Sequence, residues 1–250
     1  MTSRSRTRIV IPANNESAAI GRVVSVAVEY SPVIVVDDAS TDDTARIAAM
    51  AGATVLRMPR KSGQGAALRV GIAHALETRA ERVVLMDGDG QHNPVETSRF
   101  LEWHDATDCD LLIGRRTFSQ MPGFRRHLNR VSTWAYGAAA GYRIEDVQCG
   151  FRLLGPRLLP LYVLARSNGF GYALEMINLA AEAGMMIDSV PIETHYAPEI
   201  ASHRRTPRDV WDMLVLTLRP RVRGGRRART RQTAASPRPV VKVARSSVAD

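Results

Sequence analysis

The sequence predicts a single α/β domain, with a mostly parallel central sheet flanked by helices. Short apolar runs alternate along the chain with segments whose apolar residues recur at helical spacing. The runs at 8–12, 33–36 and 83–86 are each followed by polar or acidic residues, as strands are at the carboxyl edge of an open parallel sheet. The chain has 250 residues, 45% of them hydrophobic, which is enough for one large core.

Strands and helices are expected to alternate in the first half of the chain. We expect strands over residues 8–12, 33–38, 54–58 and 83–86, followed in turn by helices over 20–28, 45–51, 70–76 and 95–104. The turn after the first strand has two interpretations: a helix start capped by Asn15 or Ser17, or a nucleotide-binding turn. The glycine-bearing loop 60–67 lacks the full pattern of a P-loop NTPase, so a kinase or ATPase is not supported.

The second half is less regular. A fifth strand is expected over 110–116, ending in two arginines where the earlier strands end in acids. Residues 117–142 fit either a helix with a basic end and an apolar remainder or an amphipathic core helix with solvated arginines. We interpret 146–152 as a polar insertion before a leucine-rich helix, and 185–192 as a final edge strand. The apolar stripe of 207–218 fits either a helix at a membrane surface or a helix packed on the core.

The net charge of +9 is concentrated at the C-terminus. Residues 221–250 contain eight arginines, one lysine and one acid, so residues 1–220 carry about +1. We therefore expect a folded domain over 1–218 and a disordered, arginine-rich tail over 219–250. A near-neutral folded part argues against the alternative of a nucleic-acid-binding protein, because such proteins usually present a basic folded face.

Cysteine content and hydropathy indicate the compartment. The two cysteines, Cys109 and Cys149, are far apart and have no metal-binding spacing, which is typical of a reducing compartment. No apolar run approaches the ~20 residues of a membrane span, and no signal peptide precedes the first strand. We expect a cytoplasmic protein, with peripheral contact to the cytoplasmic face of the membrane as a further possibility.

The stretch at 83–94 carries the strongest chemical signal. Asp87 and Asp89 follow an apolar strand at i, i+2 spacing, which places both carboxylates on one side of the chain. Two carboxylates so close repel each other unless a cation lies between them, and Mg²⁺ or Mn²⁺ takes carboxylate and phosphate oxygens. Gln91 adds an amide oxygen, so Asp87, Asp89 and Gln91 are the candidate metal ligands. A bare Asp-x-Asp is more often a solvated loop, but this one follows a buried strand and precedes Gln-His-Asn-Pro.

Several motifs together resemble a known family. They occur in the order IVIPANNE, VVDDASTDDT, GQGAALRVGIAHA, VVLMDGDGQHNP, GRR, DVQCGFR, GFGYALEM and VPI. This set resembles the family 2 glycosyltransferases of the GT-A fold, and within them the dolichol- and polyprenyl-phosphate sugar transferases, over about residues 6–215. The resemblance implies a Rossmann-like domain and a metal-dependent, inverting hexosyltransferase. It also implies a UDP- or GDP-sugar donor, Mg²⁺ or Mn²⁺ as cofactor, and a polyprenyl phosphate acceptor.

The resemblance further implies which residues form the site. The residues expected to bind the donor and its metal are Pro12, Asn14, Glu16, Val36, Asp38, Gly63, Asp87, Gly88, Asp89, Gln91 and Arg116. Those expected to take part in catalysis are Asp89, Arg116, Gln148 and Arg152. Gly150 and Phe151 belong to the same acceptor-side motif as the last two.

Two departures from the family leave the acceptor and the sugar open. Residues 196–205 lack the Gly-x-Ser-Lys element of the dolichol-phosphate mannose branch, which puts mannose and GDP in question. The C-terminal membrane helices of many relatives are missing, which favours the alternative of a soluble hydroxyl acceptor.

A hydroxyl acceptor needs a general base, for which Asp146 and Glu175 are the candidates, whereas a phosphate acceptor is already anionic. The arginines on the acceptor side favour phosphate; they are Arg115, Arg116, Arg125, Arg126, Arg152, Arg204 and Arg205.

Overall fold

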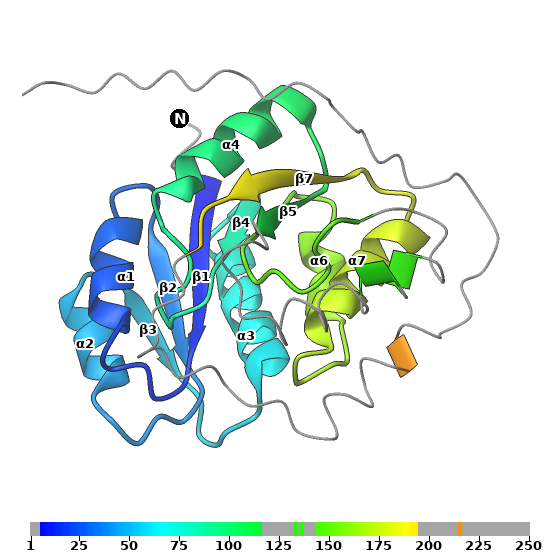
Figure 1. Cartoon of the computed structure of the whole chain (residues 1–250). Coiled ribbons are helices and arrows are strands. Elements are labelled where there is room, and N and C mark those ends of the chain that lie inside the picture. Colours follow the sequence, from blue (N-terminus) through cyan, green and yellow to red (C-terminus); the bar gives the residue numbers. More distant parts are fainter. Residues whose placement is uncertain (1–5, 117–132, 135, 138–143, 195–214, 217–250) are drawn as a thin grey trace, which may run out of the picture.

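A seven-stranded mixed sheet forms the centre of the protein (Figure 1). The computed structural model describes residues 6–116, 133–134, 136–137, 144–194 and 215–216. Its strands run in the order β3-β2-β1-β4-β6-β5-β7, and all neighbouring pairs are parallel except those that β6 makes. The predicted α/β class with a mostly parallel sheet is therefore confirmed.

The predicted strands and helices of the first half are present, but α3 begins at Gln64, within the loop predicted at 60–67. In the second half, the strands predicted at 110–116 and 185–192 are also present. The strands are β1 (Thr7–Ala13), β2 (Val33–Asp37), β3 (Thr54–Arg57), β4 (Arg82–Leu85), β5 (Leu111–Arg116), β6 (Arg152–Leu154) and β7 (Ile187–Ile192). The helices are α1 (Ile20–Ala27), α2 (Thr44–Met50), α3 (Gln64–Glu77), α4 (Glu96–Thr107), α6 (Leu159–Val163) and α7 (Tyr172–Glu182).

The helices cover the sheet from both sides. In Figure 1, α1 and α2 lie beside β2 and β3 on one side, and α3, α6 and α7 lie on the other. Helix α3 packs on β1, β2 and α6, while α4 contacts β6 and β7. The apolar stripe of α1 that predicted this helix is buried, at Ile20, Val23, Val24 and Ala27. No helix in the part of the chain that the structure describes combines the length and the apolar character of a membrane span.

Strand β6 was not predicted. It lies antiparallel between β4 and β5, so that Arg152 pairs with Leu85 on one side and with Ile113 on the other. The sequence interpretation of 146–152 as a polar insertion is therefore wrong at its end, where the strand begins. A three-residue strand that starts with an arginine shows neither alternation nor an apolar run, so its pattern carries no strand signal.

The predicted caps of α1 are also wrong. The helix begins at Ile20 without a side-chain cap, because the Asn15 side chain instead accepts a hydrogen bond from the Thr41 backbone at 2.8 Å. Asn15 has a positive φ of 59°, and asparagine adopts this left-handed conformation more readily than most residues. The side chain thus joins the turn after β1 to the turn after β2.

Several predicted segments lie outside the described residues. These are most of the helices expected at 117–142 and 207–218, including Trp211, and the whole tail at 219–250. Within them, residues 133–134, 136–137 and 215–216 are helical, and Leu216 packs against the core. Asn178 of α7 joins these two short pieces, because it accepts a hydrogen bond from the Tyr136 hydroxyl at 2.6 Å and donates to the Leu216 carbonyl at 3.2 Å.

Close packing of α3 on the sheet depends on a glycine. A Cβ atom added at Gly71 would lie 2.4 Å from Cγ1 of Val10 in β1 and 3.0 Å from Cγ2 of Val36 in β2. Gly71→Ala should therefore lower the free energy of unfolding by about 1–3 kcal/mol, as overpacking of a close-packed core does. Chemical denaturation measures this change. Val70→Ala, one position along the same helix at a side chain that is 40% exposed, should stay within about 0.5 kcal/mol of the parent. Equal stability of the two variants would contradict the close contact.

Candidate active site

The carboxyl ends of β1, β2 and β4 meet at one edge of the sheet, as predicted. Ala13 at the end of β1 pairs with Asp37 at the end of β2, and the Asp38 backbone donates to the Ala13 carbonyl at 2.8 Å. On the other side of β1, the Met86 backbone donates to the Val10 carbonyl at 3.3 Å. The polar residues that follow these three strands are thereby gathered around the end of β1.

Asp87 and Asp89 follow β4 in a tight turn. Asp87 accepts a hydrogen bond from the Gln64 side chain at 2.7 Å. Asp89 accepts two from Gln91, one from its backbone at 2.9 Å and one from its side-chain amide at 2.7 Å. The glycine between the acids is packed against α1, since a Cβ at Gly88 would lie 3.2 Å from Cδ1 of Ile20. The turn therefore holds both carboxylates close to the end of the sheet.

The charges of this turn suit a divalent cation. Burial, and then the neighbouring Asp87, raise the pKa of Asp89 from 3.8 to about 6. A divalent cation between the carboxylates would remove the repulsion that contributes to this shift. No third His, Cys, Asp or Glu completes a metal cluster within the described ranges. Two carboxylates with open coordination positions are typical of sites where phosphate oxygens of a ligand supply the rest.

A second group of polar residues lies at the ends of β1 and β2. Asn14 donates to the Asp38 carbonyl at 2.8 Å, and the Lys61 ammonium donates to the Asn14 side chain at 2.7 Å. The Asp38 carboxylate accepts the backbone N–H groups of Ser62 and Gly63, both at 2.7 Å. Asp38 therefore fixes the loop before α3, a role that its position in the sequence does not indicate.

The other predicted donor-binding residues differ in their exposure. Pro12 and Val36 lie buried in β1 and β2, so their side chains belong to the core. Glu16 is half-buried, and its backbone N–H donates to the Thr44 hydroxyl at 2.8 Å. Gly63 has a φ of +97°, and a Cβ there would lie 2.4 Å from the Asn168 carbonyl oxygen. Gly63 thus lets the loop before α3 pack against the segment before α7.

The two arginines at the end of β5 are both paired with acids. Arg116 donates to both carboxylate oxygens of Asp146, from Nε at 2.7 Å and from Nη2 at 3.0 Å, and the Asp146 side chain is fully buried. Arg115 pairs with Glu145. This bidentate pairing with Asp146 fixes the plane of the Arg116 guanidinium at the carboxyl edge of the sheet.

Two other predicted catalytic residues have different surroundings. Gln148 is half-buried, and its backbone donates to Asp146 at 3.3 Å. Arg152 is fully buried, and its guanidinium donates to the backbone carbonyls of Val147, Cys149 and Ala173. Arg125, Arg126, Arg204 and Arg205 lie outside the described residues.

Both candidate general bases are engaged with the chain itself. The Glu175 carboxylate accepts the backbone N–H groups of Arg166 at 2.8 Å and Ser167 at 2.7 Å, and the residue is buried. Asp146 forms the pair with Arg116 described above. Both carboxylates therefore already bind groups of the chain in this structure.

Sequence reasoning did not connect three neighbouring residues with Asp87. They are Gln64, His92 and Gly150. Nδ1 of the buried His92 accepts the Asp87 backbone N–H at 3.4 Å, and burial lowers the pKa of His92 to about 4, so the ring is neutral at pH 7. A Cβ at Gly150 would lie 2.4 Å from Oδ2 of Asp87. All three occur within the motifs quoted above, but only the fold shows which residue each one touches.

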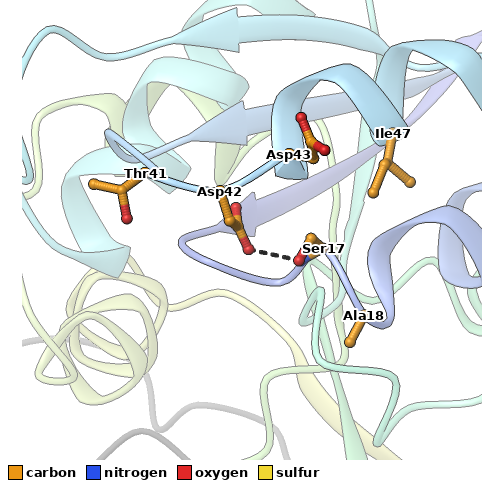
Figure 2. A pocket seen from close by; sticks show the side chains of 6 residues that line it. All are labelled: Ser17, Ala18, Thr41, Asp42, Asp43 and Ile47. Carbon is orange, nitrogen blue, oxygen red and sulfur yellow. Dashed lines mark hydrogen bonds between the residues drawn. The ribbon is translucent and has the colours of Figure 1, made fainter.

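A separate open hollow of 520 Å³ lies beside the turns that follow β1 and β2 (Figure 2). It is lined by Ser17, Ala18, Thr41, Asp42, Asp43 and Ile47, none of which is a predicted site residue. Burial acts to raise the pKa of Asp42, but hydrogen bonds from Thr44 and Ser17 outweigh it and lower that pKa to about 2. Hydrogen bonds therefore stabilise the ionised form of this carboxylate, whereas burial raises the pKa of Asp89.

Comparison with known proteins adds three findings. Residues 8–158 match the family described as glycosyl transferase family 2. The undecaprenyl-phosphate mannosyltransferase of Micrococcus luteus is 31% identical over 203 residues, 75% of this chain and 82% of that protein. The polyprenol monophosphomannose synthase of Mycolicibacterium smegmatis is 30% identical over 203 residues, 75% of this chain and 76% of that protein.

Among solved structures, glucosyl-3-phosphoglycerate synthase from Mycobacterium tuberculosis has the same fold. Its complex with Mn²⁺, uridine-diphosphate and phosphoglyceric acid superposes with a TM-score of 0.64 at 21% identity. The match covers 85% of this chain and 78% of that one. The GT-A architecture implied by the sequence motifs is thereby confirmed.

The raised pKa of Asp89 gives a prediction for stability. Because the folded-state pKa of about 6 exceeds 3.8, the ionised carboxylate destabilises the fold above pH 6, and this cost disappears below about pH 4. In the presence of a chelator, Asp89→Asn should therefore be more stable than the parent at pH 8, by up to about 3 kcal/mol, and equally stable at pH 4. Thermal unfolding across this pH range measures the difference. Asp42→Asn is the control with the opposite sign, because the pKa of Asp42 is lowered. A gain at pH 8 for Asp42→Asn, or none for Asp89→Asn, would contradict this reading of the electrostatics.

Proposed function

Because the chain belongs to glycosyl transferase family 2, we propose that it transfers a sugar from a UDP- or GDP-sugar to a polyprenyl monophosphate, with inversion at the anomeric carbon. One observation carries the proposal. Segment 146–150 holds Arg116 through Asp146 and lies against Asp87 through Gly150, so a single short segment joins the cation to the two-carboxylate turn. A site with this combination suits the diphosphate of a sugar nucleotide.

Asp87 and Asp89 are the proposed ligands of Mg²⁺ or Mn²⁺. When bound, the ion neutralises charge that develops on the leaving nucleoside diphosphate. The Gln91 amide nitrogen donates to Asp89, so we assign Gln91 the role of orienting that carboxylate in addition to its predicted role as a ligand. Gln64 orients Asp87 in the same way. The Mn²⁺ in the complex of the mycobacterial synthase supports a divalent ion here.

Arg116 is the proposed phosphate-binding cation. Asp146 occupies its Nε and Nη2 groups and holds the guanidinium in one plane. The fixed cation stabilises negative charge on the diphosphate or on an acceptor phosphate without reorganising during the reaction. Asn14, Glu16, Lys61 and the loop fixed by Asp38 lie at the ends of β1 and β2, where we place the nucleoside.

The acceptor is proposed to be a phosphate rather than a hydroxyl. A monophosphate is already anionic at pH 7 and attacks without a strong general base. Both carboxylates that could serve as that base, Asp146 and Glu175, are buried and bound by the chain itself. The names of the two bacterial relatives, which refer to undecaprenyl phosphate and to polyprenol, support a polyprenyl carrier. Such a substrate would bring the protein to the cytoplasmic face of a membrane as a peripheral protein.

The proposed reaction is tested directly with a panel of substrates. The protein should form a glycolipid from polyprenyl phosphate and at least one of the UDP- or GDP-sugars when Mg²⁺ or Mn²⁺ is present, and excess chelator should stop the reaction.

Asp89→Ala should lower the rate roughly 10³-fold or more, because a lost metal ligand removes several kcal/mol of transition-state stabilisation. Asp43→Ala, at an exposed acid beside the hollow, is the control and should retain full activity. Glycolipid formation that persists with chelator or with Asp89→Ala would refute the metal mechanism. Transfer to a soluble hydroxyl compound alone would refute the phosphate acceptor.

Gly150 provides a second test of the same site. A Cβ there would displace the Asp87 carboxylate, from which it would lie 2.4–2.8 Å, so Gly150→Ala should lower kcat/KM on the order of 10²-fold through misplacement of the donor. Gly155→Ala is the matched control, because the atoms nearest to its Cβ would be the carbonyl oxygens of Cys109 and Asp110, both at 3.3 Å, and Cα of Asp110 at 3.4 Å, all remote in sequence from the carboxylate turn. Steady-state kinetics of both variants at equal folded fraction measures the effect. Equal kinetics of the two variants would show that the contact between Gly150 and Asp87 has no part in the reaction.

A further inference from the structure

Arg152 is a fully buried cation whose described hydrogen-bond partners are not carboxylates. Nε donates to the Cys149 carbonyl at 2.8 Å, Nη1 to the Ala173 carbonyl at 2.7 Å, and Nη2 to the Val147 carbonyl at 2.7 Å. Burial of a charge is costly unless hydrogen bonds satisfy it, and here three carbonyls of the backbone do so. A methionine or leucine would fill the same volume in β6 without this cost. The three hydrogen bonds therefore indicate a role for the Arg152 side chain other than filling the core.

Two of the three carbonyls belong to the segment that joins the halves of the proposed site. Val147 and Cys149 lie within 146–150, between Asp146, which holds Arg116 at 2.7 Å, and Gly150, which lies against Asp87. Both carbonyls are bound by the same planar guanidinium, whose N–H groups have fixed relative directions. The backbone of this segment is thereby held in one conformation, and with it the separation between Arg116 and Asp87.

The third carbonyl extends the arrangement to α7. Ala173 follows Tyr172, and the Tyr172 ring centroid lies 6.0 Å from the guanidinium carbon of Arg152. The Tyr172 hydroxyl lies 3.5 Å from the Gln64 amide nitrogen, which donates to Asp87 at 2.7 Å. Arg152 is thus connected to Asp87 from two sides, through Gly150 and through Tyr172 and Gln64.

We infer that Arg152 is a positioning residue: through three backbone carbonyls it sets the relative placement of Arg116 and of the carboxylate turn at Asp87. This role rests on the proposed function and replaces the direct contact with substrate that the sequence motif indicates for Arg152. The residue acts through the segment 146–150 and through α7, and it makes no contact with the reacting atoms.

The sheet contains a matched control. Arg82, the first residue of β4, is also buried, and it donates to the Thr7 hydroxyl at 2.9 Å and to Asp105. It lies at the amino end of β4, whereas Arg152 pairs with Leu85 at the carboxyl end of the same strand. Replacement of either arginine removes a buried cation from the sheet, but only Arg152 is connected to the proposed site.

The kinetic test compares Arg152→Met with Arg82→Met at a temperature where both are folded. Arg152→Met should lower kcat on the order of 10²-fold more than Arg82→Met, with a smaller change in KM for the sugar nucleotide. Arg152→Lys keeps the charge, but one ammonium cannot span three carbonyls, so it should stay within a few-fold of Arg152→Met. Restored activity in Arg152→Lys, or equal losses in Arg152→Met and Arg82→Met, would overturn the positioning role.

Amide hydrogen exchange gives a readout that does not depend on activity. Exchange at 147–151 and at Asp87 should accelerate at least tenfold in Arg152→Met, and should be unchanged there in Arg82→Met, which should instead accelerate exchange around Thr7. Unchanged exchange at 147–151 in Arg152→Met would overturn the inference. If the parent chain forms no glycolipid, the proposed function fails, and the exchange data still decide whether Arg152 holds this segment.

Failure of the Arg152 variants to fold also tests the positioning role. Arg152→Gln, which keeps an amide donor for the Cys149 carbonyl, replaces Arg152→Met if the latter does not fold, with Arg82→Gln as its control. If both Arg152 variants are unfolded while both Arg82 variants are folded, Arg152 is required for the fold as a whole, and the positioning role is overturned.

Discussion

The repulsion between Asp87 and Asp89 is the constraint on which the rest of the site depends. Two carboxylates held at the end of a buried strand stay together only if the surrounding chain fixes them. Gln64 and His92 hold Asp87 by hydrogen bonds, Gly150 leaves room for its carboxylate, and Gln91 holds Asp89. Burial, and then the charge of Asp87, raise the pKa of Asp89, so the ionised form of this carboxylate is disfavoured. In the proposed function, a bound divalent cation would offset this unfavourable pair of charges.

The mixed order of the sheet brings the two halves of the proposed site together. Strand β6 lies antiparallel between β4 and β5, and its first residue, Arg152, pairs with the last residue of β4 and with Ile113 in the middle of β5. This position brings the segment before β6 next to the carboxyl ends of both neighbours, Asp87 after β4 and Arg116 in β5. A purely parallel order would place β5 beside β4 and leave no room for that segment. The antiparallel insertion is therefore what joins the acidic half of the proposed site to its basic half.

Much of the fold could be predicted from the sequence, because β1, β2, β4 and β5 are apolar runs and the helix α1 has a clear apolar stripe. The carboxylates of the site could also be predicted, since Asp87 and Asp89 follow a strand directly. The strand β6 could not, because three residues beginning with an arginine carry no periodicity. Residue roles that depend on contacts distant in sequence were not predictable either. The motif gives Arg152 a place beside the acceptor, whereas the fold buries it against backbone carbonyls. The Asp38 carboxylate binds the loop before α3. Gly150 leaves room for the carboxylate of Asp87, which lies 63 residues earlier in the chain.

The central claim is that the turn after β4 binds a divalent ion together with a nucleoside diphosphate. Calorimetric titration of UDP and of GDP, each with Mn²⁺ and with a chelator, tests it most directly, because no acceptor and no turnover are needed. Mn²⁺ should tighten the binding of at least one of the two diphosphates tenfold or more, and that diphosphate should tighten the binding of Mn²⁺ by the same factor, since the coupling is reciprocal. Equal affinity for both diphosphates with and without the ion would contradict the claim.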